Sequence, residues 1–235
     1  MRQVSLADWH PTKKQITDVN KVLKTGRLTY GPFTRKFEEE FARLHNFKHA
    51  IFVNSGTSGL QLVFDYLKRK YNWKDGDEVI VPSVTFVATV NILLQNRLKP
   101  VLVDVDIDTY NIDTRDPKFI ENKITKKTRA ILAVNLLGRG VQIQEIRKIA
   151  KRHNLKVIED SCEAMFNWYP DIDKPVGSLA DFAVYSSYLA HIISTGVGGI
   201  ICTNSDKDEQ YLRSMIWHGR DNLYLHIDAN NEVPL

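Results

Sequence analysis

Residues 54–59 read Asn-Ser-Gly-Thr-Ser-Gly, a composition suited to binding an anion. They follow the apolar run Ala50 to Val53 and precede a helical pattern from Leu60 to Lys70. Gly56 lets the backbone approach an anion, and the free N–H groups at a helix start, with the Thr57 hydroxyl, can hold a phosphate. The segment lacks the lysine of a P-loop, so a nucleoside triphosphate is not expected. An ordinary tight turn explains these residues equally well.

Two further residues follow the ends of apolar strands. Asp160 comes after the run Lys156 to Glu159, where parallel sheets bind ligands, and its carboxylate could pair with a protonated ring nitrogen. Taken alone, a helix cap is the simpler explanation of Asp160. Phe86 could stack on a planar cofactor, although aromatic residues at such positions more often belong to the core.

A histidine stands in a segment that contains no lysine. The sequence SSYLAHIISTGVGG runs from Ser186 to Gly199 and carries His191, and no lysine occurs between Pro175 and Asp206. A lone histidine among apolar residues is usually a core residue whose ring is hydrogen-bonded. The glycines of STGVGG resemble part of a dinucleotide loop only weakly, because they precede a strand instead of joining a strand to a helix.

The elements that position these residues follow an α/β pattern. Short apolar, β-branched runs alternate with helical patterns, which predicts a mainly parallel sheet between helices. Several runs are apolar almost throughout, as in strands covered on both faces. The seven predicted strands are Ala50–Val53, Glu78–Val81, Pro100–Val105, Ala130–Val134, Lys156–Glu159, Phe182–Tyr185 and Gly199–Thr203.

Two helices are predicted in detail. Thr12 and Gln15 have the spacing of a capping box, and Gly26 is expected to end the helix that they begin. Each of the two helices carries an apolar stripe that we expect to lie in the core. The stripes are Ile16, Val19, Val22 and Leu23 in the first helix, and Ile143, Ile146, Ile149 and Ala150 in the second.

Composition excludes several classes of protein. The chain has 235 residues, a net charge of +4 and 43% hydrophobic residues, so a globular fold is expected and a nucleic-acid partner is not. Cys162 and Cys202 support neither a disulfide framework nor a metal site, and a reducing cytoplasm is the expected location. Neither a signal peptide nor a membrane span is expected.

The polar tail HIDANNEVPL either ends the protein in a loop or marks this chain as the N-terminal part of something longer.

Six motifs occur together in order: NSGTSGL, GDEVIVPSVTFVAT, VLVDVD, ILAVNLLG, VIEDSCEA and GSLADFAVYSS. This arrangement, from about Leu23 to past Thr203, resembles the DegT/DnrJ/EryC1/StrS family of pyridoxal-phosphate (PLP) enzymes that act on nucleotide-linked sugars. The resemblance implies an α/β fold of type I, the aspartate-aminotransferase-like large domain, over residues 1–235. It also implies a homodimer, and a smaller C-terminal domain that this chain lacks.

The resemblance assigns roles to individual residues. Gly56, Thr57 and Ser186 would hold the cofactor phosphate. Phe86 would stack on the pyridine ring, and Asp160 would pair with the ring nitrogen and keep it protonated.

The family's aminotransferases have a lysine five residues after the serine matched by Ser186, and this position is His191 here. The branch that contains GDP-4-keto-6-deoxymannose 3-dehydratase has histidine there, and it has glutamate at the position of Glu163. Lysine would bind the pyridoxal aldehyde covalently, whereas histidine can exchange protons without doing so. The expected catalytic residues are therefore His191 and Glu163.

The resemblance implies a PLP or pyridoxamine-phosphate (PMP) dependent 3-dehydratase of deoxysugar and polysaccharide biosynthesis. Its substrate would be a nucleotide-linked 4-keto-6-deoxysugar and its amino donor L-glutamate. His191 would remove a proton from C4′ of the cofactor and assist departure of the C3 hydroxyl as water. A nucleotide-sugar aminotransferase and a non-catalytic PLP-binding relative remain alternatives. An iron–sulfur dehydratase is disfavoured, because two cysteines cannot supply its four ligands.

Overall fold

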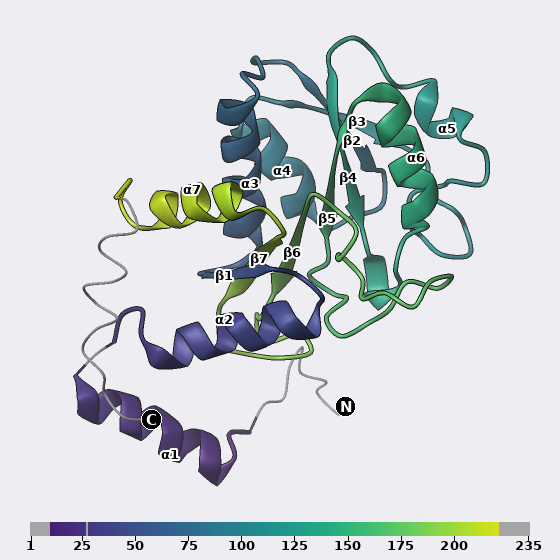
Figure 1. Ribbon diagram of the computed structural model, residues 1–235. Helices are drawn as coiled ribbons and strands as arrows, with labels where there is room; N and C mark the ends of the chain where they lie inside the picture. The colour runs from purple at the N-terminus through teal and green to yellow at the C-terminus, as the bar shows by residue number, and fades with distance from the viewer. Residues whose placement is uncertain (1–9, 27, 221–235) are drawn as a thin grey trace, which may run out of the picture.

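The computed structural model describes residues 10–26 and 28–220 (Figure 1). The helices are α1 (Lys13–Thr25), α2 (Pro32–Leu44), α3 (Gly56–Lys70), α4 (Val87–Gln95), α5 (Lys118–Glu121), α6 (Ile143–His153) and α7 (Asp206–Ile216), with a single 3-10 turn, η1 (Leu136–Gly138). The strands are β1 (His49–Val53), β2 (Glu78–Pro82), β3 (Lys99–Val103), β4 (Thr128–Val134), β5 (Lys156–Asp160), β6 (Phe182–Ser186) and β7 (Gly199–Thr203).

The seven strands form one sheet in the order β1-β7-β6-β5-β4-β2-β3. Strands β2 to β6 pair in parallel wherever they are neighbours. Strand β7 is antiparallel to both β1 and β6, so β1 runs in the same direction as the parallel strands. The mainly parallel seven-stranded sheet is confirmed, with β7 as its antiparallel member.

Each predicted strand coincides with an observed one, and only the third differs appreciably in its end. The prediction extended this strand to Val105, but β3 ends at Val103. Val105 instead forms an isolated antiparallel bridge with Ile112, and the Asp113 N–H bonds the Asp104 carbonyl at 3.1 Å. The chain turns back on itself here, because these local hydrogen bonds replace those of the sheet.

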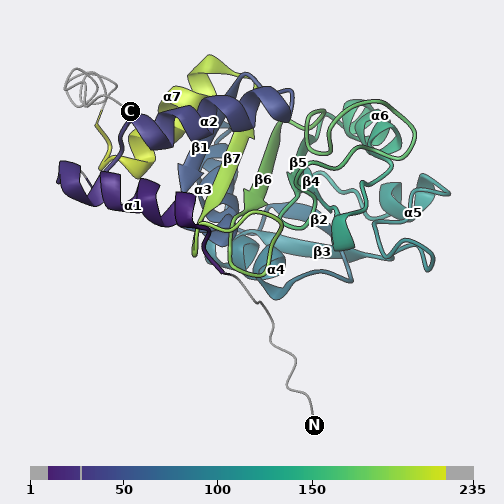
Figure 2. The same cartoon turned by 90° about the horizontal axis from the view of Figure 1, so that it is seen from below.

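Helices cover both faces of the sheet. Alternate residues of β4 enter opposite cores: Ala130 and Leu132 pack with side chains of α3 and α4, and Ile131 and Ala133 pack with side chains of α6. Figure 2 shows α2 and α6 on one side of the sheet and α4 on the other. Burial of both faces explains why the strands are apolar throughout.

The predicted stripe of the α6 helix is confirmed as core. Ile143, Ile146, Ile149 and Ala150 are all buried. They pack against the face of the sheet formed by side chains such as Ile131 and Val157.

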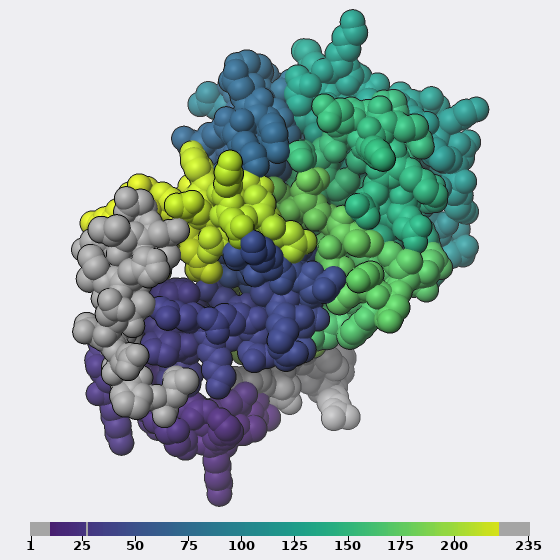
Figure 3. Space-filling model, viewed as in Figure 1, coloured from purple at the N-terminus to yellow at the C-terminus, as the bar shows by residue number. Residues whose placement is uncertain are grey.

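The core prediction for the first helix is wrong within the described structure. Helix α1 has the predicted capping box at Thr12 and ends at Gly26 in the left-handed conformation, but it buries no residue. Ile16, Val19 and Leu23 are exposed. The helix lies away from the sheet beyond α2, and Figure 3 shows it projecting from the end of the molecule. Periodicity identified an amphipathic helix correctly but could not say what its apolar face would meet.

Helix α2 is attached to the sheet by a buried ion pair. Glu38 accepts hydrogen bonds from the Phe52 N–H at 2.6 Å and from the Arg213 guanidinium at 2.9 Å. Arg213 also donates to the Ala50 carbonyl at 3.1 Å. The pair thereby joins α2, β1 and α7.

Among the described residues, no helix is long and apolar enough to cross a membrane.

Replacing Ile146 with alanine should lower the free energy of unfolding by about 3 kcal/mol, because the side chain is fully buried and its loss leaves a cavity. The matched change Ile107→Ala, at a residue that is 70% exposed, should lower it by less than about 1 kcal/mol. Urea unfolding of both variants measures the difference. Equal losses would contradict the assignment of this face of α6 to the core.

Candidate cofactor site

The predicted site residues come together at one edge of the sheet. Strands β1, β2, β5 and β6 all end at this edge, and β7 begins there. The start of β7 fixes the geometry, since Gly199 is paired with Val53 of β1 on one side and with Ser186 of β6 on the other. Residues far apart in sequence therefore meet where parallel sheets bind ligands.

The first feature of this edge is the N-terminus of α3. Ser55 caps the helix by accepting a hydrogen bond from the Ser58 N–H at 3.0 Å. The N–H groups of Gly56 and Thr57 come before the first bond of the helix, which the Gly59 N–H donates to the Ser55 carbonyl. The segment is thus a helix N-terminus and more than a tight turn, and its partial positive charge suits a phosphate.

Glycine is required where α3 meets its neighbours. A Cβ on Gly56 would lie 2.6 Å from the Cys162 sulfur and 3.2 Å from the Ser186 Cβ. A Cβ on Gly199 would lie 2.4 Å from the Ser55 carbonyl carbon, which is backbone and cannot move aside. The start of α3 therefore packs against Ser186 and the start of β7, an arrangement that suits a phosphate.

Asp160 is a buried carboxyl at the end of β5. It accepts hydrogen bonds from the Thr89 hydroxyl at 2.8 Å and from the Cys162 N–H at 3.3 Å. Burial raises its pKa, the two hydrogen bonds oppose this, and the nearby Glu163 carboxylate raises it further. No helix begins after Asp160, so the helix-cap explanation is wrong. A buried carboxyl short of positive partners suits a protonated ring nitrogen.

Phe86 is not a core residue. Its side chain is 66% exposed, although it directly precedes α4. The Thr85 hydroxyl donates to the Thr89 hydroxyl at 2.9 Å, and Thr89 in turn donates to Asp160. These hydrogen bonds connect Thr85, the residue before Phe86, to the carboxyl, and an exposed aromatic ring at this position can stack on a planar cofactor.

Glu159 forms a second acidic centre that the sequence did not reveal. It is completely buried and accepts hydrogen bonds from the Tyr169 hydroxyl at 2.5 Å and the Asn135 amide at 2.8 Å. Burial raises the pKa of Glu159 to about 7, against the opposing effect of these hydrogen bonds. Because neighbouring residues of a strand point to opposite faces, Glu159 and Asp160 have separate partners. The sequence did carry one sign of this centre, a glutamate within an otherwise apolar strand, which must find hydrogen-bond partners if it is buried.

Glu163 is held by the loop that follows β4. Its carboxylate accepts a hydrogen bond from the Leu137 N–H at 2.6 Å, and Leu137 has a left-handed backbone with φ of 54°. Asn135 supports this loop by donating to Ser161 at 2.9 Å and accepting from the Val141 N–H at 2.9 Å. The structure therefore orients Glu163 through the NLLG motif.

His191 differs from a core histidine, and His45 shows the contrast. His45 is fully buried, with one ring nitrogen 3.0 Å from the Phe41 carbonyl and the other accepting from the Phe166 N–H at 3.2 Å. Burial lowers its pKa to about 4. His191 is half-buried in the loop after β6, and its ring makes no hydrogen bond within residues 10–26 and 28–220. The core explanation of His191 is therefore wrong.

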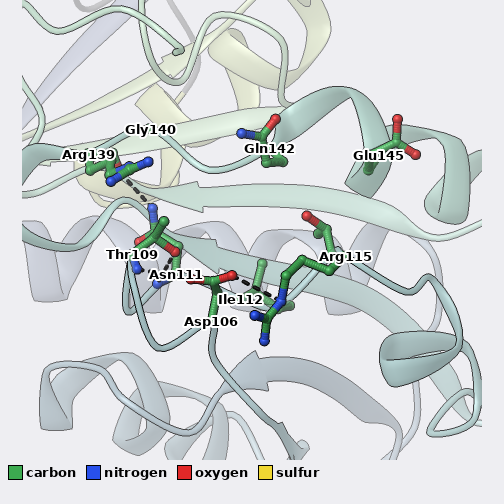
Figure 4. A pocket seen from close by; sticks show the side chains of 10 residues that line it. Asp106, Thr109, Asn111, Ile112, Arg115, Arg139, Gly140, Gln142 and Glu145 are labelled. Atoms are coloured by element: carbon green, nitrogen blue, oxygen red, sulfur yellow. Dashed lines mark hydrogen bonds and ion pairs between the residues drawn. The ribbon is translucent and has the colours of Figure 1, made fainter. Parts of the chain in front are cut away.

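A separate cavity of about 310 Å³ lies beside the loop after β4 (Figure 4). It contains none of the predicted site residues. Arg115 pairs there with Asp106 at 3.0 Å, and Asn111 braces the loop by accepting from the Leu136 N–H at 3.0 Å and donating to the Arg139 carbonyl at 2.8 Å. The hydrogen bonds of Asn111 hold the loop, and we assign the cavity itself no ligand.

Comparison with known proteins identifies the family. Residues 10–230 match the DegT/DnrJ/EryC1/StrS aminotransferase family. The chain belongs to this family. A GDP-perosamine synthase of Caulobacter vibrioides is 40% identical over 191 residues, which are 81% of this chain and 49% of the synthase. This chain spans about half the length of the curated relatives that it matches.

Two solved structures illustrate the range of activities in the family. A GDP-4-keto-6-deoxymannose-3-dehydratase with a trapped PLP–glutamate geminal diamine has a TM-score of 0.84 and 32% identity, over 92% of this chain and 55% of that one. A Helicobacter pylori aminotransferase of pseudoaminic acid biosynthesis has a TM-score of 0.85 and 29% identity, over 93% and 57%. The family member described here thus has the type I fold of PLP-dependent enzymes, as predicted.

The raised pKa of Glu159 predicts a pH-dependent stability. A carboxyl that titrates near pH 7 when folded and near 4.5 when unfolded stabilises the protein fully below pH 4.5, and this contribution is lost as the pH rises through 7. The free energy of unfolding relative to Glu159→Gln should therefore fall by roughly 3 kcal/mol over this window. Denaturant titrations of both proteins at several pH values measure it, and a constant difference would contradict the buried, protonated state.

Proposed function

We propose that this chain carries the cofactor-binding site of a PLP/PMP-dependent nucleotide-sugar 3-dehydratase. One observation carries the choice within the family. By the family resemblance, His191 stands where the aminotransferases have their lysine, and its ring makes no hydrogen bond within the described residues. Histidine exchanges protons near neutral pH but does not capture an aldehyde.

The residues around the sheet edge fit the cofactor. Gly56, Thr57 and Ser186 would hold its phosphate, Phe86 would cover its ring, and Asp160 would hold a proton on the ring nitrogen. The buried Asp160 carboxyl stabilises that proton more strongly than an exposed one would. When bound, PMP supplies the amino group that reacts with a ketone, together with a ring that accepts electrons.

His191 would act as the acid and base of the reaction. It would take a proton from C4′ of the cofactor and deliver one to the departing C3 hydroxyl, so that the sugar loses water. Glu163, held by the Leu137 N–H, adds a negative charge near Asp160 and favours the protonated ring nitrogen.

The proposed substrate is a nucleotide-linked 4-keto-6-deoxysugar, and the proposed amino donor is L-glutamate. Support comes from the dehydratase with the trapped PLP–glutamate adduct. An aminotransferase remains the second candidate, since the pseudoaminic acid enzyme is equally similar in structure. The two candidate enzymes would form different products: the dehydratase would form a deoxygenated ketosugar, and the aminotransferase would form an aminosugar.

The cytoplasmic location stays a prediction.

Mass spectrometry of the product tests the proposal. The full-length protein with PLP, L-glutamate and a panel of nucleotide-4-keto-6-deoxysugars should give a product that has lost the C3 oxygen and gained no nitrogen. His191→Asn should lower this rate at least about 100-fold while still binding PLP, because general acid–base catalysis is lost. An aminosugar product would establish the aminotransferase instead, and full activity of His191→Asn would remove the role of His191.

We further propose that the protein forms a homodimer through α1. The exposed apolar side chains Ile16, Val19 and Leu23 form a stripe on a well-capped helix that buries none of its residues within the described structure. Helices with such a face normally bury it against another element. A second copy of the chain is the occupant that the family resemblance implies.

The double variant Ile16→Asp with Leu23→Asp should weaken dimerisation of the full-length protein at least tenfold, because two charges enter an apolar interface. The matched control, Thr17→Asp with Lys21→Asp, changes exposed residues that lie away from the apolar stripe on the same helix and should leave the dimer intact. Sedimentation velocity over a range of concentrations measures both. A dimer that survives in the first variant would exclude α1 from the interface.

A further inference from the structure

The segment between β6 and β7, residues 187–198, carries His191 without any helix or strand. Most of its large side chains are exposed, including Tyr188, Ile192 and Val197. Burial therefore contributes little to holding the segment in place. Because the His191 ring has no hydrogen bond within the described residues, the position of that ring depends on how the backbone of the segment is held.

Two hydroxyl residues close the base of this segment. The Ser187 N–H donates to the Gly198 carbonyl at 2.9 Å, and the Thr195 N–H donates to the Ser187 carbonyl at 3.0 Å. The hydroxyls of Ser187 and Thr195 are 2.7 Å apart, and the Thr195 hydroxyl donates to the Val197 carbonyl at 3.0 Å. Since a hydroxyl has one hydrogen, Ser187 must be the donor to Thr195. These four hydrogen bonds connect the first residue of the segment, Ser187, to its last residues, Thr195 to Gly198.

The STGVGG motif provides the space for this network. A Cβ on Gly198 would lie 2.3 Å from the Ser187 hydroxyl oxygen and 2.5 Å from that of Thr195. It would also lie 2.7 Å from the Phe52 ring. Because Gly198 has no side chain, the two hydroxyls can pack directly over its backbone. The glycine of this motif is therefore explained by packing, without a bound nucleotide.

The network is linked to both His191 and the phosphate site. The His191 N–H donates to the Tyr188 carbonyl at 2.9 Å, and the Tyr188 N–H donates to the Ser186 hydroxyl at 3.3 Å. A short path of hydrogen bonds thus runs from the residue proposed to bind the phosphate to the residue proposed to move the proton. Ser187 of the base network lies between Ser186 and Tyr188 in the chain, so the network and this path share the same backbone.

We propose that Ser187 and Thr195 are positioning residues that hold His191 over the cofactor site through the hydrogen-bond network at the base of its loop. The inference rests on the proposed function for the identity of the reacting group. The network acts on the backbone of the loop, so it contributes to the rate of proton transfer and little to binding of the sugar.

Three single variants of the full-length protein test this inference. Thr195→Val keeps the shape of the side chain and the backbone N–H but removes the hydroxyl. Thr195→Ser restores a hydroxyl at the same place. Ser194→Ala is the matched control, because it removes a neighbouring hydrogen bond to the Gly196 N–H, at 3.1 Å, that does not belong to the base network.

The first measurements require no turnover. In Thr195→Val, amide hydrogen exchange of residues 187–198 should be about fivefold faster, and the NMR signals of the His191 ring should shift or broaden. Thr195→Ser and Ser194→Ala should resemble the unaltered protein. In the deoxygenation assay, Thr195→Val should lower kcat about tenfold with KM for the sugar unchanged within twofold.

Unchanged exchange and unchanged His191 signals in Thr195→Val would overturn the inference, as would a loosened loop with full kcat. If the unaltered protein forms no 3-deoxy product, the proposed function fails, and the exchange and NMR measurements still decide whether the network holds His191. The two failures are therefore distinguishable.

Discussion

The structure depends on the close approach of α3 to the start of β7. Strand β7 runs antiparallel between β1 and β6, so that Gly199 faces both Val53 and Ser186 at one edge of the sheet. The backbone of Ser55 and Gly56 packs directly against Gly199, where any Cβ would collide with main-chain atoms. This contact places a helix N-terminus at the edge where β6 ends and β7 begins, and the partial positive charge of a helix N-terminus suits an anion.

Strand β5 separates two acidic groups that are adjacent in sequence. Asp160 points toward α4 and accepts a hydrogen bond from the Thr89 hydroxyl. Glu159 points to the other side and is satisfied by Tyr169 and Asn135. Because Asn135 also holds the loop that bonds Glu163, the buried Glu159 carboxyl is linked through Asn135 to the position of Glu163. Strand alternation lets two consecutive acids serve different purposes without facing each other.

The two histidines compared above, His45 and His191, lie in different environments. His45 is packed between aromatic rings, with Phe41 stacked at 4.0 Å between centroids, and both of its ring nitrogens are used. His191 lies on an open loop whose order comes from backbone and hydroxyl hydrogen bonds at its base. The buried ring of His45 is kept neutral by its lowered pKa, whereas the ring of His191 is only half-buried.

The sequence by itself determined the strands, the α6 core stripe, the α1 capping box and the family motifs, since hydrophobic period and capping chemistry are local properties. It also showed that a histidine stands where lysine is expected. Only the tertiary structure decided that the α1 stripe is exposed, that Phe86 and His191 lie outside the core, and that Glu159 is a buried network centre. Each of these depends on which distant segment packs against the residue, and a local pattern carries no information about that. The Ser187–Thr195 network belongs to the same class, because two residues eight positions apart meet only when β6 and β7 pair.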